Sequence, residues 1–223
     1  MKINTNVSSL TAQEASTNTN NSIKNSLEKL STGLKINKAS DDASGLAIAD
    51  KLRTQVTSIN QGVSNGNSAV ALLQIADKSM AEQSKILDTV KAKLIQANTD
   101  TTSEDGRNAI AKDISKLLEQ LDNIAKQTNY NGTNLLQETR TGTCTKAALS
   151  FQIGENVGDM ITTKSVQANT VGFSLTQLVT DSAATTFTRA MATAGQSKVD
   201  AALTTLNGYR GDIGSTQNQV ESA

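Results

Sequence analysis

The chain has 223 residues with 21 basic and 21 acidic side chains, one cysteine, and neither histidine, proline nor tryptophan. This neutral balance argues against a nucleic-acid-binding protein, which should carry a basic surface. Without histidine the chain cannot build a Ser-His-Asp triad or a histidine-ligated metal site, and the single Cys144 can form no internal disulfide. No apolar stretch is long enough to cross a bilayer. We therefore expect no enzyme, no cofactor or metal site and no membrane insertion.

Side chains that fill a thick core are scarce, since the chain holds only three Phe and two Tyr. Its apolar residues are mainly Ala, Leu, Ile and Val, which suit narrow seams between helices. With no proline, no helix has to be broken by one. The composition therefore predicts a mainly α fold, an elongated rod of antiparallel helices packed as a coiled coil.

The first predicted helix covers about residues 7–34, and Gly33 is expected to end it in a left-handed conformation. Its second half carries apolar residues four, three and four positions apart, as an amphipathic helix does. These residues are Ile23, Leu27, Leu30 and Leu34.

A connector is expected over residues 35–45, ending with an Asp that caps the next helix. Asp41 and Asp42 lie in this connector and are the one carboxylate pair that could bind a cation. Helix capping explains the pair more simply.

The strongest pattern is a heptad repeat over residues 46–98, which predicts a long helix in a left-handed coiled coil. Val56, Val63 and Val70 occupy a companion seam, which then lapses to Asp77, Ser84 and Lys91. The residues that recur every seven positions are Leu52, Ile59, Gly66, Leu73, Met80, Leu87 and Leu94.

A short turn over residues 99–107, with capping candidates at 103–105, should let a second helix fold back antiparallel along the first. Asn131-Gly132 then predicts a further turn. The apolar residues of the second helix are Ile110, Ile114, Leu117, Leu121 and Ile124.

Two β-prone stretches, residues 145–153 and 160–166, flank a glycine-containing turn and predict a small β-hairpin patch on the rod. Helix is expected to return near residue 183, and its seam still continues at Glu221-Ser222-Ala223. We interpret this ending as a truncated chain. The seam residues of this helix are Val199, Leu203, Leu206, Ile213 and Val220.

Several stretches together resemble the bacterial flagellins. Residues 25–37 read NSLEKLSTGLKIN and residues 39–49 read ASDDASGLAIA, which is similar to the amino-terminal signature of that family. Residues 127–132 (QTNYNG), 151–154 (FQIG) and 206–218 resemble later landmarks. The resemblance covers nearly the whole chain, and its character is that of flagellins from Campylobacter- and Arcobacter-like bacteria.

The resemblance implies a division of the chain into five parts. Residues 1–34 would form an inner-core helix, 35–45 a spoke connector and 46–138 the helices of the rod. Residues 139–185 would form a short surface β-hairpin region and 186–223 a truncated returning rod helix. The C-terminal core helix of the family would be lacking.

The implied role is that of a structural subunit of the extracellular flagellar filament, which drives swimming. Its partners would be other subunits, the flagellar type III export apparatus and the filament cap, whereas contact with an export chaperone is doubtful because the tail that binds it is missing. The expected residues of the core and subunit-packing seam are Leu27, Leu30, Leu34, Ile36, Asp41, Asp42, Leu52, Val56, Ile59, Val63, Leu73, Met80, Leu87, Leu94, Ile114, Leu117, Leu121, Leu203 and Leu206.

Residues 87–94 (LDTVKAKL) match the stretch by which some flagellins activate an innate immune receptor of animals. Asp88 and Val90 stand where the two arginines of that stretch are expected, followed by Leu94. Loss of arginine contacts at an interface hot spot predicts weak or no activation of the receptor.

Two other readings remain. The hook–filament junction protein shares the amino-terminal signature, but its connector usually carries a proline after the Asp pair, where this chain has Ala43. A coiled-coil adaptor module would account for the heptads and leave the connector motif unexplained.

Overall fold

The computed structural model describes residues 6–137 and 145–223. Cys144 and the first five residues of the predicted inner-core helix lie outside these ranges. The chain divides into two compact units, Met1–Thr57 and Ser58–Ala223. It is mainly helical with two small antiparallel strand pairs, which confirms the predicted fold class.

The first unit contains α1 (Val7–Thr32), a connector and the first turns of α2 (Ala43–Ala97). Asn6 caps α1 by accepting a hydrogen bond from the Ser9 backbone N–H at 3.2 Å. Gly33 ends the helix with φ of +70°, and its N–H donates to the Lys29 carbonyl at 2.9 Å, as predicted for this glycine.

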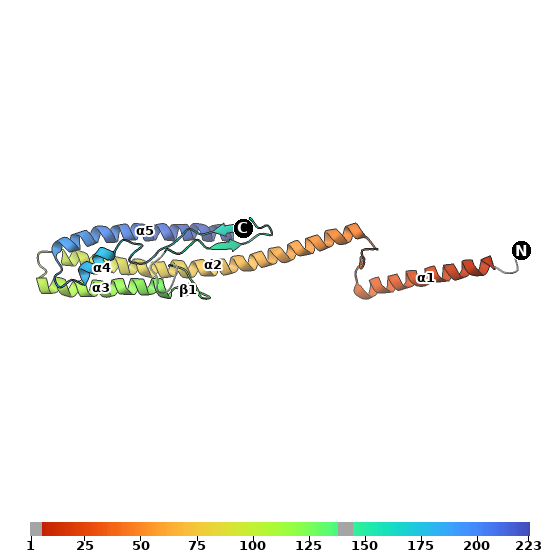
Figure 1. The fold of residues 1–223 in the computed structure, drawn as a ribbon, viewed down its shortest axis with the longest axis horizontal. Helices are drawn as coiled ribbons and strands as arrows, with labels where there is room; N and C mark the ends of the chain where they lie inside the picture. Colours follow the sequence, from red (N-terminus) through yellow and green to blue (C-terminus); the bar gives the residue numbers. More distant parts are fainter. Residues whose placement is uncertain (1–5, 138–144) are drawn as a thin grey trace. The chain divides into compact units, whose positions relative to one another are not determined.

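In the second unit, α3 (Glu104–Gln127) and α5 (Arg189–Glu221) run alongside the later turns of α2 (Figure 1). Ser103 caps α3 by accepting from the Gly106 N–H at 3.1 Å, at one of the predicted capping positions. Lys93 pairs with Asp113 near the connection between α2 and α3, and Gln83 donates to the Leu121 carbonyl farther along. A later residue of α3 thus contacts an earlier residue of α2, so the two helices are antiparallel.

The same antiparallel relation holds between α2 and α5. Lys91 forms an ion pair with Asp200 at 2.5 Å, and Asp77 forms one with Arg210 at 2.8 Å. These are two of the positions at which the companion seam of α2 lapses from valine to a charged residue. The lapse therefore marks where α5 supplies an opposite charge instead of an apolar contact.

The core lies in the second unit and is formed mainly by the three long helices. Most of its buried side chains are aliphatic, in agreement with the composition. Members with no more than 1% exposure include Leu73, Met80, Leu87, Val90 and Leu94 from α2, Ile114, Leu118 and Leu121 from α3, and Val199 and Leu206 from α5.

Two antiparallel strand pairs accompany the helices. β1 (Asn129–Tyr130) and β2 (Thr133–Asn134) enclose the expected Asn131-Gly132 turn, with φ of +49° and +81° at its two residues. Positive φ at both positions is the mark of a tight two-residue hairpin turn. β3 (Ser150–Gln152) and β4 (Met160–Thr162) form the predicted hairpin, extended by a bridge between Lys146 and Val166.

The segment after this hairpin was expected at the surface, and its described part instead contributes to the core. It contains the short helix α4 (Thr176–Ser182), which the sequence pattern did not predict. Phe173, Leu175, Leu178 and Phe187 are at most 2% exposed. Two of the chain's three phenylalanines are among these side chains. This part of the chain therefore packs on the long helices and helps to bury their apolar faces.

At Gly62 of α2 the chain next to β3 approaches the helix closely. A Cβ atom built there would lie 1.9 Å from the Ile153 carbonyl oxygen. Backbone of the hairpin would have to move to admit it, because real Cβ atoms need well over 3 Å. Glycine is thus required at this crossing in spite of its low helix propensity.

We predict that Gly62→Ala destabilises the second unit by about 1–3 kcal/mol, since overpacking shifts backbone. Urea unfolding followed by helix circular dichroism measures the change. Gly208→Ala is the matched control, because nothing lies within 4 Å of a Cβ at Gly208 in α5. It should stabilise the helix by about 0.5–1 kcal/mol. Equal effects of the two substitutions would contradict the close approach at Gly62.

Candidate functional site

The surface of the first unit is its distinguishing feature, because none of the residues from 6 to 57 is buried. Helix α1 has 26 residues and not one of them is buried. Isolated helices are marginal in water, and most helical stability in proteins comes from packing of an apolar face. The exposed large apolar residues of this unit are Val7, Leu10, Ile23, Leu27, Leu30, Leu34, Ile48, Leu52 and Val56.

In the second unit, the same apolar repeat of α2 begins exposed and becomes buried. Ile59 and Val63 are more than half exposed, whereas Ala69 and Leu73 are 1% exposed. The change occurs near Gly66, where Val220 of α5 packs 3.7 Å from a Cβ position. Val220 lies in the last turn of α5, which ends at Glu221.

The predicted seam residues therefore divide into two groups. Those that remain uncovered are Leu27, Leu30, Leu34, Leu52, Val56, Ile59 and Val63, and Ile36 is half-buried. Those that form the internal core are Leu73, Met80, Leu87, Leu94, Ile114, Leu121 and Leu206, with Leu117 and Leu203 partly buried against it. Only the first group is available to another molecule, and we call it the open seam.

Sequence reasoning missed part of the uncovered set. Val7, Leu10 and Ile48 are exposed apolar residues that the predicted seam omitted. Ile48 lies one turn before Leu52 on the same face of α2, so helical spacing could have found it. Val7 and Leu10 precede a polar stretch that masked the pattern.

Asp41 and Asp42 both act as acceptors for backbone N–H groups. The Asp42 carboxylate accepts from the Gly45 N–H at 2.9 Å and caps α2. One oxygen of Asp41 accepts from the N–H groups of Asn37 and Lys38 at 3.1 and 3.2 Å, and the other lies 3.5 Å from the Lys29 ammonium. Asp42 thus caps α2 as the capping interpretation predicts, whereas Asp41 accepts from the backbone of the connector itself.

Further contacts tie the connector to α1. Asn37 donates through its side chain to the Thr32 hydroxyl at 2.7 Å, and Lys38 pairs with Glu28 at 2.6 Å. A Cβ at Gly45 would lie 2.5 Å from Asp42 and 3.0 Å from Ile36, so the connector also packs closely on the first turn of α2. These contacts give an exposed connector a defined geometry.

Contacts in the connector shift the pKa values of Asp41 and Lys38. The backbone N–H groups of Asn37 and Lys38 hold the pKa of the Asp41 carboxyl below its usual value. The hydrogen bond to Glu28 and the charge of that carboxylate raise the pKa of Lys38.

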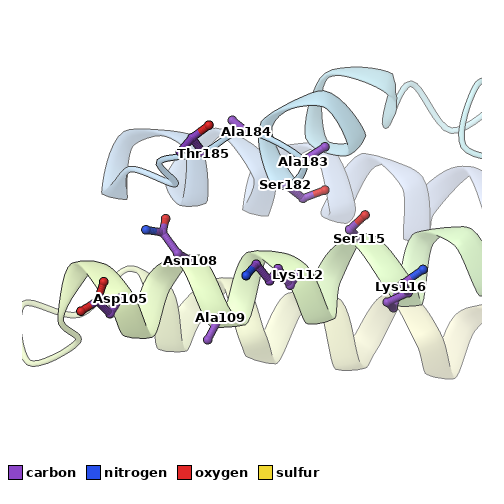
Figure 2. Close-up of a pocket in the computed structure, with 10 residues that line it drawn as sticks. All are labelled: Asp105, Asn108, Ala109, Lys112, Ser115, Lys116, Ser182, Ala183, Ala184 and Thr185. Atoms are coloured by element: carbon purple, nitrogen blue, oxygen red, sulfur yellow. The ribbon is translucent and has the colours of Figure 1, made fainter.

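An open hollow of about 680 Å³ lies between α3 and residues 182–185 (Figure 2). Asn108 and Ser115 extend from α3 toward Thr185 and Ser182 on the opposite wall. The Asn108 side-chain oxygen accepts from the Phe187 N–H at 2.8 Å, and Lys116 pairs with Glu119 at 2.8 Å. The first contact joins α3 to the chain entering α5, and the second lies within α3.

Two negative results apply to the described ranges. Among residues 6–137 and 145–223, no three or more Cys, Asp or Glu side chains gather as metal ligands would. No helix within these ranges combines the length and hydropathy needed to cross a bilayer.

The stretch matched to the receptor-activating segment is only partly exposed. Val90 and Leu94 are 0% exposed and belong to the core, whereas Asp88 is exposed. Of the three residues, Asp88 alone can meet a partner, because a fully buried position cannot present an arginine or any other side chain to one.

We predict that the connector is ordered above the ordinary pKa of aspartate and loosens in acid. Because the pKa of Asp41 is lowered on folding, its contribution is fully present above pH ~4 and is lost as the pH falls through the lowered value. Carboxyl carbon shifts of Asp41, and amide shifts of Asn37 and Lys38, measure this by NMR.

In Asp41→Asn the acid transition of the two amide shifts should vanish. Titration of Asp41 at or above the usual aspartate range would contradict the hydrogen bonding described for it.

Comparison with known proteins agrees with this architecture. The family model for the bacterial flagellin N-terminal helical region matches residues 3–141. Flagellin B of Helicobacter pylori is 45% identical over 166 residues, which covers 72% of this chain and 32% of the relative. The flagellar filament 33 kDa core protein of Treponema phagedenis is 30% identical and covers 99% of this chain and 79% of the relative.

A crystal structure of Bacillus cereus flagellin superimposes with a TM-score of 0.59 at 26% identity, covering 71% of this chain and 85% of the other. The chain spans about a third of the length of the Helicobacter flagellins it matches. Its family is one of structural proteins. The chain belongs to the bacterial flagellin family.

Proposed function

We propose that this chain is a structural subunit that polymerises into the extracellular flagellar filament of a swimming bacterium. The observation that carries the proposal is the open seam, most of whose residues lie in a unit without a single buried residue between positions 6 and 57. A helical segment that buries none of its apolar side chains is stabilised by a surface supplied from outside itself.

Other copies of the same chain suit that surface. The open seam has the aliphatic heptad spacing of a coiled-coil face, and helices of this kind interlock with one another through their a and d positions. The chain has no net charge, so copies repel one another little when they are packed densely. The relatives named for flagella support the same reading.

The division of labour within the chain follows from this proposal. Residues 1–34 act as the inner-core helix, 35–45 as the spoke, and 46–138 with 186–223 as the rod, with 139–185 as a short outer region. The hydrogen-bonded connector around Asp41 supports the spoke role, because it fixes how one helix leads into the next within the first unit.

The remaining expected partners are part of the proposal. Export would proceed through the flagellar type III apparatus, followed by assembly under the filament cap, while contact with an export chaperone stays doubtful. Kinship with Campylobacter- and Arcobacter-like flagellins also stays a prediction, since the relatives reported above are from Helicobacter and Treponema.

Two alternatives make different predictions. A hook–filament junction protein would join filament to hook and would not elongate flagellin seeds into long filaments. A coiled-coil adaptor would form a soluble oligomer of fixed size that ignores such seeds. The family match favours the filament subunit over the adaptor.

We predict that replacing Leu52 and Val56 by Gln abolishes elongation of short flagellar seeds. Both side chains are more than half exposed, so the folded monomer loses no buried contact and its stability should change by less than about 0.5 kcal/mol. Pelleting and electron microscopy measure elongation, and circular dichroism checks the helix content of the monomer.

Lys51→Gln is the matched control, because Lys51 is exposed on the same turn of α2 and lies outside the open seam. It should leave elongation intact. If the double variant elongates seeds as well as the parent chain does, the open seam is not the assembly surface and the proposal fails.

We further propose that the protein activates the innate flagellin receptor weakly. A receptor surface that binds an arginine would instead contact the carboxylate of Asp88. Loss of a hot-spot arginine weakens the binding free energy by about 2 kcal/mol or more. A reporter-cell assay with a receptor-active flagellin as positive control measures this. Signalling by this chain at the same dose as the control would overturn the expectation.

A further inference from the structure

The sequence contains three Asn-Gly pairs, Asn65-Gly66, Asn131-Gly132 and Asn207-Gly208. This dipeptide is the one most prone to a spontaneous backbone reaction, because glycine leaves the nitrogen after asparagine unhindered. The three pairs are nearly equivalent as sequence. The structure places them in different environments, and we therefore expect them to react at different rates.

The reaction is intramolecular and needs only water. The backbone nitrogen of the glycine attacks the side-chain carbonyl carbon of the asparagine and loses its proton. The side-chain amide nitrogen leaves as ammonia, and a five-membered succinimide ring forms. Water then opens the ring at either carbonyl, giving aspartate or isoaspartate. The net change is one water consumed and one ammonia released, with no oxidation or reduction.

Two of the pairs are held inside helices. Asn65 and Gly66 lie in α2, and Asn207 and Gly208 lie in α5. Helical ψ keeps the glycine nitrogen away from the side-chain carbonyl, and the helix ladder engages its N–H. Asn65 is held further by its own side chain, which donates to the Gln152 carbonyl at 3.0 Å and accepts from Gln61 at 3.0 Å.

Asn131 lacks both kinds of restraint. It lies at the exposed tip of the β1–β2 hairpin, and within the described residues its side chain and the Gly132 N–H form no hydrogen bond. Attack requires rotation about ψ of Asn131. The strands beside the turn pair at Asn129 with Asn134 and at Tyr130 with Thr133, and the Leu135 N–H donates to the Thr128 carbonyl beyond them at 3.2 Å. Rotation at the exposed tip breaks none of the helix hydrogen bonds that restrain the other two pairs.

We propose that Asn131 is a self-modification site of this protein, at which a succinimide forms with Gly132 and hydrolyses to aspartate and isoaspartate, while Asn65 and Asn207 are protected by their helices. Isoaspartate adds one methylene to the backbone of a two-residue turn, and either product adds a negative charge. The turn precedes the buried Leu135 and Leu136, so a change there alters how the chain leaves α3 and reaches the core.

The test is ageing of the intact chain in mildly alkaline buffer, followed by peptide mass spectrometry that separates asparagine, aspartate and isoaspartate at each pair. A parallel sample in concentrated urea supplies the intrinsic rate of each site without structure. Reaction inside a helix has to wait for local opening, and about 1.4 kcal/mol of opening free energy lowers the reactive fraction about tenfold.

We expect the folded-to-unfolded rate ratio at Asn131 to exceed the ratios at Asn65 and Asn207 by at least this factor of ~10. Asn131→Gln should remove the product at that site, because the larger ring that glutamine requires closes slowly. Equal ratios at the three pairs, or a folded chain in which Asn131 stays intact while Asn207 reacts, would overturn the proposal.

Discussion

The burial of the apolar stripe on the later turns of α2 is the interaction on which the second unit depends, with Leu73, Met80, Leu87 and Leu94 at most 1% exposed. Each Å² of apolar surface removed from water contributes about 25 cal/mol to stability. An exposed apolar stripe therefore contributes none of this stabilising free energy until another surface covers it. Helices α3 and α5 and the irregular segment around α4 all pack toward the covered part. The open seam is what remains.

Polar residues fix how the helices meet on the covered part. Gln83 is fully buried and donates to the carbonyls of Leu121 and Ala168, at 3.2 and 2.7 Å. Asp122 accepts from both the N–H and the hydroxyl of Thr170 at 2.8 Å, which ties the same irregular segment to α3. Burying a polar group costs free energy of folding unless the group is hydrogen-bonded. A shift of register along the aliphatic seam would leave these groups without their hydrogen-bond partners and would therefore be unfavourable.

The long helices could be predicted from the sequence because their signals are local and repeated. The heptads of α2, the glycine stop at Gly33, the cap at Ser103 and the hairpin around residues 154–158 each follow from a few neighbouring residues. The covering role of the segment near α4 could not be predicted, since its buried Phe173, Leu175 and Leu178 follow no sustained period. Their burial is decided by helices distant in the sequence.

The candidate site was predicted as one seam, and the structure divides it. Periodicity identified Leu52 and Leu87 as equivalent, although the first is 55% exposed and the second fully buried. What buries Leu87 is the packing of α3, α5 and the segment around α4 on the later turns of α2, which the pattern of α2 does not contain. The same limit applies to Val90, whose position in the core depends on the orientation of α2 toward its neighbours.

An uncovered aliphatic face also has a thermal signature. Burial of apolar surface lowers the heat capacity and is driven near room temperature by the entropy of water. On the proposed function, the first unit would make most of its apolar contacts at the moment of association and not during folding of the monomer. Association would then show a strongly negative heat-capacity change and weaken on cooling, so that cold rather than mild heat would be the first condition to release subunits.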